Sequence, residues 1–160
     1  MVTQPDIHPG DCLLYSGTSL WSRVIMIKTW SDISHSEVAL NEHYAITSRT
    51  SHGVNLYTLT WDHLAHVLRP EGPIDFGKAM AWFKIVKGEK YGYWQALRFF
   101  RMGKENMTRM MCSPCCTRLY RAGGFHPFAG DYDASLVAPR DFLTSPHFTV
   151  VWSRDVESTH

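Results

Sequence analysis

Short runs of apolar residues, several of them alternating with polar ones, occupy much of the first half of the chain. Such runs, bounded by turn residues, predict strands. Pro9-Gly10-Asp11 marks the turn before the first run, and Asn41-Glu42 and Ser51-His52-Gly53 are short enough to join neighbouring strands. The strands expected on this basis cover residues 12–15, 35–40, 43–49, 54–59, 63–69 and, near the end of the chain, 148–152.

Apolar residues spaced three or four positions apart predict helices in other segments. We expect helices over 20–30, over 91–101, and from the capping residue Asp75 to Val86. The segment after Gly124 is rich in proline, so we expect it to be irregular until the last strand.

The chain has 160 residues, which is the length of one domain, and it contains no internal repeat or linker. We therefore predict a single α+β domain over 1–160, with helices packed on an antiparallel sheet. The segments 1–9 and 153–160 are expected to be loose ends.

One further helix is predicted around a group of cysteines between residues 110 and 124. Ser113 suits the N-cap, Pro114 suits the first helical position, and Gly123-Gly124 suits the C-terminal end. Cys112 then lies beside unpaired amides and the positive end of the helix dipole. Because this environment lowers the pKa of a thiol, Cys112 is the candidate nucleophile.

Composition and charge exclude several classes of function. The formal net charge is +1 and no basic patch carries interleaved aromatic residues, so we do not expect a nucleic-acid partner. No apolar run reaches membrane-spanning length, and residues 1–10 lack the apolar core of a signal peptide, which indicates a cytoplasmic protein as encoded. Cys112, Cys115 and Cys116 fall too close together to cross-link a fold, which indicates reduced thiols. The oligomeric state is left open.

A cysteine nucleophile needs a base to accept its proton and a group to orient that base. His35 opens a predicted strand, so its ring lies at a strand end where it can meet the amino end of a helix packed on the sheet. The next strand returns antiparallel, and side chains alternate along it. Either Thr47 or Ser48 should therefore reach the imidazole.

Several short motifs occur in an order that resembles one known family. That family is the circularly permuted branch of the NlpC-type papain-like thiol hydrolases, which includes the bacterial YiiX-like proteins and, more distantly, the lecithin:retinol acyltransferase-like proteins. In this branch the histidine precedes the cysteine. The resemblance covers roughly Gly10 to Pro146 and rests on Gly10-Asp11, Ser34-His35, Gly53-Val54, Leu68-Arg69-Pro70 and Cys112-Ser113.

The resemblance implies a papain-like fold with Cys112 as nucleophile and His35 as general base. It implies Thr47, twelve positions after His35, as the third catalytic residue, and it places Tyr91 near the site. Ser113 and Tyr91 are the expected supporting residues, and the Cys112 amide with its neighbours at the helix start is expected to hold the oxyanion.

Two positions depart from the family pattern. Pro114 stands where glutamate or glycine is usual, which is compatible with a helix start. Thr47 brings no negative charge to stabilise an imidazolium, and the loss of a charged orienter slows such catalysis by orders of magnitude. Glu37, on the same strand face as His35, and Ser48 are the alternatives for this position.

These residues predict a cysteine hydrolase that cleaves an amide bond through an acyl-enzyme, without metal or cofactor. A peptidoglycan-type peptide is the leading substrate, reached from inside a phage particle or by another delivery route. The alternatives are hydrolysis or acyl transfer on a lipid amide or ester, and a papain-like binding module that has lost turnover.

A different class of protein follows if the thiols bind zinc or undergo redox chemistry. Cys112 and Cys115 have the spacing of a ligand pair, and His63 with His66 is the candidate second pair. The simpler interpretation of Cys115 and Cys116 is that both pack in the core as small apolar residues.

Overall fold

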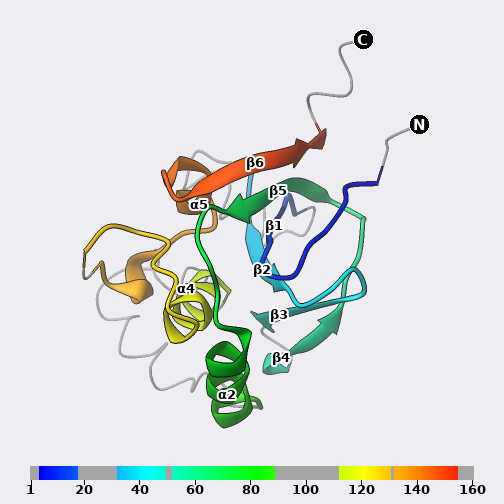
Figure 1. The fold of residues 1–160 in the computed structure, drawn as a ribbon. Coiled ribbons are helices and arrows are strands. Elements are labelled where there is room, and N and C mark those ends of the chain that lie inside the picture. Colours follow the sequence, from blue (N-terminus) through cyan, green and yellow to red (C-terminus); the bar gives the residue numbers. More distant parts are fainter. Residues whose placement is uncertain (1–3, 18–31, 50–51, 89–111, 131, 155–160) are drawn as a thin grey trace, which may run out of the picture.

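A six-stranded antiparallel sheet forms the centre of the protein, as seen in a computed structural model (Figure 1). The structure describes residues 4–17, 32–49, 52–88, 112–130 and 132–154. Along the sheet the strands follow the order β4-β3-β2-β1-β5-β6, and every neighbouring pair is antiparallel. The strands are β1 (Cys12–Tyr15), β2 (His35–Ala39), β3 (Tyr44–Arg49), β4 (Gly53–Thr58), β5 (Leu64–Pro70) and β6 (Phe148–Ser153).

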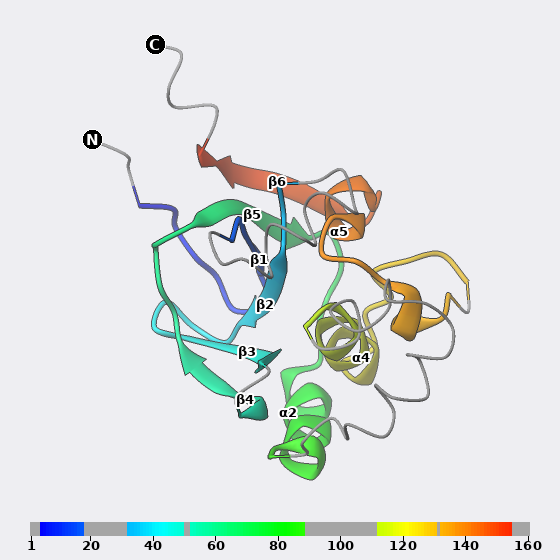
Figure 2. The ribbon, with the colours of Figure 1, turned by 180° about the vertical axis from the view of Figure 1, so that it is seen from behind.

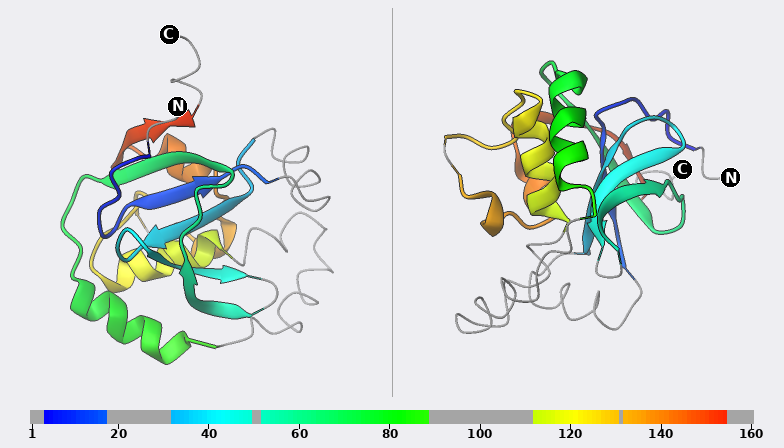
Figure 3. Two further views of the ribbon diagram at one scale, coloured as in Figure 1. Left: turned by 90° about the vertical axis from the view of Figure 1, so that its right-hand side faces the viewer. Right: turned by 90° about the horizontal axis from the view of Figure 1, so that it is seen from below.

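Two longer helices, α2 (Phe76–Val86) and α4 (Ser113–Ala122), lie side by side against one face of this sheet (Figures 1 and 2). The view from below shows both helices on the same side of the strands (Figure 3). A short 3-10 helix, η1 (Ala134–Leu136), and α5 (Asp141–Thr144) follow α4 in the chain. None of the helices that the structure describes is long and apolar enough to cross a membrane.

Alternation along the strands produces two apolar clusters, one on each face of the sheet. On β1, Cys12 and Leu14 belong to the cluster under the helices, whereas Leu13 and Tyr15 belong to the cluster on the opposite face. The helix-side cluster is the larger and includes four aromatic rings that pack edge to face or at a tilt: Tyr120, Phe125, Phe142 and Phe148.

The predicted fold class, α+β with an antiparallel sheet, is confirmed, and each predicted strand agrees with the structure to within one residue at either end. The helix from 75 is confirmed too, because the Asp75 side chain accepts a hydrogen bond from the Lys78 amide at 3.0 Å as its N-cap. The helices predicted over 20–30 and 91–101 lie outside the described residues. The segment after residue 124 is less irregular than expected, since it contains η1 and α5, which are too short to show a helical period.

Gly10 occupies the turn that leads into β1, where the chain is tightly enclosed. Its amide donates to the Ala39 carbonyl oxygen and its own carbonyl accepts from the Tyr120 hydroxyl, both at 2.8 Å. Its φ is +93°, in the region that favours glycine. A Cβ at this position would lie 2.8 Å from Ile74 Cδ1. The turn therefore joins the sheet to α4, and both its positive φ and its close neighbours favour glycine.

We expect Gly10→Ala to lower the free energy of unfolding by about 2–3 kcal/mol, because it adds both backbone strain and overlap with Ile74. Gly124→Ala is the matched control. Gly124 also has a positive φ, +78°, but a Cβ there would meet nothing within 4 Å, so the cost should be the backbone strain of about 1–2 kcal/mol. Urea denaturation measures both values. Equal losses for the two variants would show that the space around Gly10 is not restrictive.

Candidate active site

Helix α4 places Cys112 at its amino end. Cys112 is the N-cap residue, and its carbonyl accepts the first helical hydrogen bond, from the Cys116 amide at 2.9 Å. The expectation that Ser113 is the N-cap was wrong by one residue. Ser113 is the first helical residue and is buried against the sheet, where its hydroxyl accepts a hydrogen bond from Ser36 Oγ at 3.3 Å. Pro114 is the second helical residue, one position later in the helix than predicted, and still lies in its first turn.

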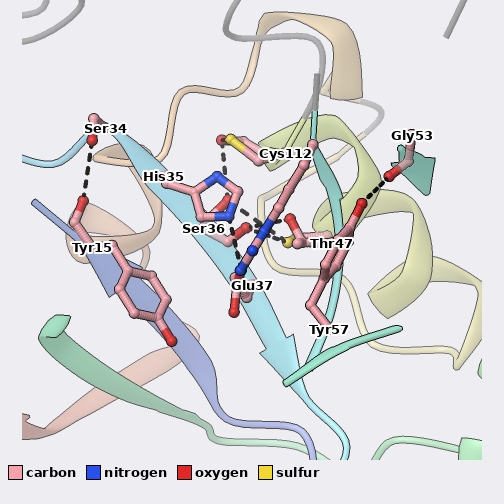
Figure 4. A network of polar contacts seen from close by, with 12 residues as sticks. Tyr15, Ser34, His35, Ser36, Glu37, Thr47, Gly53, Tyr57 and Cys112 are labelled. Atoms are coloured by element: carbon pink, nitrogen blue, oxygen red, sulfur yellow. Dashed lines mark hydrogen bonds and ion pairs between the residues drawn. The ribbon is translucent and has the colours of Figure 1, made fainter. Parts of the chain in front are cut away.

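Strand β2 brings His35 to the same point. The His35 ring and the Cys112 thiol lie close together and stabilise each other's charged forms, and Figure 4 shows the sulfur beside the ring at the start of the strand. The Ser36 amide also donates to the sulfur. Cys112 is only 3% exposed, whereas the His35 side chain is 26% exposed. The nucleophile and base predicted from the sequence therefore lie next to each other. Of the two, the His35 ring is the one that solvent contacts.

The electrostatic environment favours a thiolate–imidazolium pair. Burial raises the pKa of the Cys112 thiol. The neighbouring His35 and the Ser36 amide have the opposite and larger effect, so the pKa falls to about 7. Burial also lowers the pKa of His35, yet the Cys112 thiolate and the Glu37 carboxylate raise it to about 9. Between these two values the thiol has lost its proton and the imidazole has gained one. This is the reactive state of a cysteine nucleophile.

Glu37 holds the other side of the imidazole. Its Oε1 lies 2.9 Å from His35 Nε2 and also accepts a hydrogen bond from Arg49 Nη2 at 2.7 Å. The Glu37 side chain is almost fully buried. Burial raises the pKa of this carboxyl, but His35 and Arg49 lower it below its ordinary value. Glu37 is therefore ionised at neutral pH and stabilises the imidazolium.

Thr47, which the resemblance implies for this third position, makes a different contact. Its hydroxyl donates to the Ser36 carbonyl oxygen at 2.8 Å and so ties β3 to β2 instead of orienting the ring. Ser48 is buried, and its Oγ has no hydrogen-bond partner among the described residues. Of the three candidates for this position, Glu37 is the one that the structure places against the imidazole.

Two neighbours of the site were not predicted from the sequence. Arg49 follows Thr47 by two residues, so strand alternation puts both side chains on one face of the sheet, but the register that brings Arg49 to Glu37 does not follow from that pattern. Tyr15 pairs with His35 in the register of β1 and β2, and the centroids of their rings are 6.0 Å apart. Tyr91, the tyrosine that the resemblance implies, lies outside the described residues.

The other cysteines lie in the core. Cys115 and Cys116 are residues of α4 and are both fully buried, and burial raises the pKa of Cys115 to about 12 and that of Cys116 well above its ordinary value. Both are therefore neutral thiols at neutral pH. Within the described part of the chain, no three His, Cys, Asp or Glu side chains are grouped so that they could hold a metal ion.

We expect iodoacetamide to label Cys112 faster than Cys12, Cys115 and Cys116 near neutral pH, because burial keeps the other three thiols protonated. The Cys112 rate should rise with pH and reach half its plateau at about pH 7. Mass spectrometry of the labelled peptides measures each rate. In His35→Ala the midpoint should move to higher pH, since the imidazolium that stabilises the thiolate is gone. Equal labelling of all four cysteines would contradict the assignment.

Comparison with known proteins gives a likeness of fold. No family model matches the chain, and no curated protein matches it. Among solved structures, the chain is similar to metalloprotein yiiX from Escherichia coli O157:H7, a DUF1105 protein, with a TM-score of 0.66 and 18% sequence identity. The match covers 93% of this chain and 98% of that one. The two proteins share a fold over nearly their whole lengths, and the sequence resemblance to YiiX-like proteins agrees with this finding.

Proposed function

We propose that this protein is a papain-like cysteine hydrolase that cleaves an amide bond. One observation carries the proposal: the Cys112 thiol at the amino end of α4 lies beside the His35 ring, which is held on its other side by the buried carboxylate of Glu37 (Figure 4). A nucleophile, a base and a group that orients the base are the three parts that thiol-based acyl transfer requires.

The reaction begins with attack of the Cys112 thiolate on the carbonyl carbon of the substrate. The carbonyl oxygen gains a negative charge, which backbone amides at the amino end of α4 are suited to stabilise. The His35 imidazolium then donates its proton to the leaving nitrogen as the C–N bond breaks, which leaves a thioester on Cys112. Water attacks the thioester while His35 accepts its proton. The acid product leaves, and the thiolate and imidazolium are restored.

Glu37 supports this cycle in two ways. It fixes the orientation of the His35 ring through the Nε2 contact at 2.9 Å, and its negative charge stabilises the imidazolium. A charged residue at this position removes the weakness that a neutral threonine there would cause.

The substrate class rests on the family motifs. These motifs favour a peptidoglycan-type peptide, and the protein is then a cysteine peptidase or amidase. A lipid amide or ester is the second candidate, since it passes through the same thioester. Water completes the reaction in a hydrolase, and a second acceptor completes it in an acyltransferase.

We expect Cys112→Ala and His35→Ala each to reduce the release of new amino groups from soluble peptidoglycan peptides by at least about a thousandfold. Cys115→Ala is the control and should keep the rate within several-fold, because Cys115 is buried in the core. A parallel assay with a fatty amide and a fatty ester tests the second substrate class. Unchanged turnover in Cys112→Ala would contradict the proposal. Tight binding of peptide with no turnover in the unmodified protein would indicate a binding module.

The assignment of the third residue has its own test. Glu37→Gln should lower kcat by about a hundredfold or more, because the amide keeps the shape but loses the charge that stabilises the imidazolium. Thr47→Val should lower the free energy of unfolding by about 1 kcal/mol, from loss of the bond to Ser36, with kcat within several-fold of the original. Steady-state kinetics and urea denaturation of both variants measure these effects. A larger loss of kcat in Thr47→Val than in Glu37→Gln would return the third position to Thr47.

A further inference from the structure

Arg49 is fixed at the end of β3 by two contacts. Its Nη2 donates to Glu37 Oε1 at 2.7 Å, and its guanidinium carbon lies 4.2 Å from the centre of the Tyr57 ring. The Tyr57 hydroxyl donates to the Gly53 carbonyl oxygen at 2.9 Å, which holds the ring in place. The guanidinium is therefore held between a carboxylate and an aromatic face, a geometry that suits arginine better than lysine.

One oxygen of Glu37 serves two cations. Oε1 contacts both His35 Nε2 and Arg49 Nη2, whereas Oε2 is buried and is bonded to neither of these two residues. Arg49 and the His35 imidazolium thus compete for the same acceptor. Each weakens the hold of the carboxylate on the other.

The charges of the site balance only when Arg49 is included. In the reactive state the Cys112 thiolate and Glu37 contribute two negative charges, and the His35 imidazolium and Arg49 contribute two positive ones. Arg49 is 38% exposed, whereas Glu37 is buried. Without Arg49, a net negative charge would remain around the imidazolium and would hold its proton more firmly.

We propose that Arg49 is a positioning residue of this site, which shares the Glu37 carboxylate with His35 and so keeps the imidazolium able to give up its proton to the leaving group. This inference rests on the proposed function, since only a catalytic His35 has to release its proton during the reaction. Arg49 acts through Glu37 and His35, and it need not touch the substrate.

The charged and titratable groups around His35 come from five elements. Tyr15 faces it from β1, Glu37 from β2, Arg49 from β3 and Cys112 from the start of α4, and Tyr57 on β4 contacts Arg49. The Tyr15 hydroxyl stays neutral, because burial and the nearby Glu37 charge raise its pKa. Arg49 is thus the only permanent cation among these five residues.

The test measures the pH dependence of Cys112 alkylation by iodoacetamide in the intact protein, which requires no turnover. Arg49→Met removes a positive charge, so both titrations of the Cys112–His35 pair should move to higher pH, by about half to one unit. Arg49→Gln should do the same while keeping a donor for Glu37. Arg49→Lys keeps the charge and should restore most of the original profile. The turnover rate of Arg49→Met should fall, and Arg49→Lys should recover part of it.

Arg121→Met is the matched control. It removes the same charge from α4, but nine residues from Cys112, about 13 Å along the helix axis. Its alkylation profile should coincide with that of the unmodified protein. Thermal unfolding of every variant shows that the profiles come from folded protein.

The possible outcomes separate this inference from the proposed function. Suppose that the pH midpoint of Cys112 alkylation is low in the unmodified protein and unchanged in both Arg49→Met and Arg49→Gln. That result would overturn the role of Arg49 and leave the hydrolase proposal intact. A midpoint near the ordinary thiol value in the unmodified protein, unaffected by His35→Ala, would overturn both. If the alkylation midpoint moved as far in Arg121→Met as in Arg49→Met, the shift would come from the net charge of the protein. That result would also overturn the role of Arg49.

Discussion

The contact between the Cys112 thiol and the His35 imidazole requires that the amino end of α4 meets the first residues of β2 in one fixed position. Ser36 fixes that position with all three of its polar groups. Its amide donates to the Cys112 sulfur, and its hydroxyl donates to Ser113 at 3.3 Å. Its carbonyl accepts from Thr47 at 2.8 Å and from the Cys116 thiol at 3.4 Å. Because each of these groups is buried, a shift of α4 along β2 would leave several of them without partners.

The site lies at the start of β2 and includes residues from both faces of the sheet. Ser36 points toward α4, so its neighbours His35 and Glu37 belong to the opposite face. His35 is the first residue of β2, so its ring lies at the end of the strand. From there it can reach around the strand end to Cys112 on the other face. Glu37 is then buried on the face away from the helices. A buried carboxylate is stable only with charged partners, which His35 and Arg49 supply.

Most of the fold followed from local patterns in the sequence, and so did the two central residues of the site. Strand alternation located six strands, and Asp75 marked the start of α2 because an N-cap is a local interaction. The position of Ser113 depended on tertiary contact, since its hydroxyl binds Ser36 across the interface instead of capping its own helix. The segments η1 and α5 are too short for periodicity to appear.

The contact between His35 and Glu37 was hard to predict from their separation in the sequence. Positions two apart on a strand lie about 7 Å apart, which made Glu37 an awkward partner for His35. Both side chains are long enough to lean along the strand, and His35 Nε2 and Glu37 Oε1 lie 2.9 Å apart. Arg49 completes the contact from the next strand. That pairing depends on the register of β2 and β3. The sequence pattern indicates which face of each strand is buried, but it does not say which residues lie opposite each other.

The most direct measurement of the central claim is a titration of the His35 ring by ¹⁵N NMR, in the unmodified protein and in Cys112→Ala. The account predicts that His35 stays protonated well above neutral pH in the unmodified protein, with a pKa of about 9. In Cys112→Ala its pKa should fall by more than one unit, because the thiolate that stabilises the imidazolium is absent. A His35 ring that titrates at its ordinary value of about 6.5 in both proteins would contradict the account.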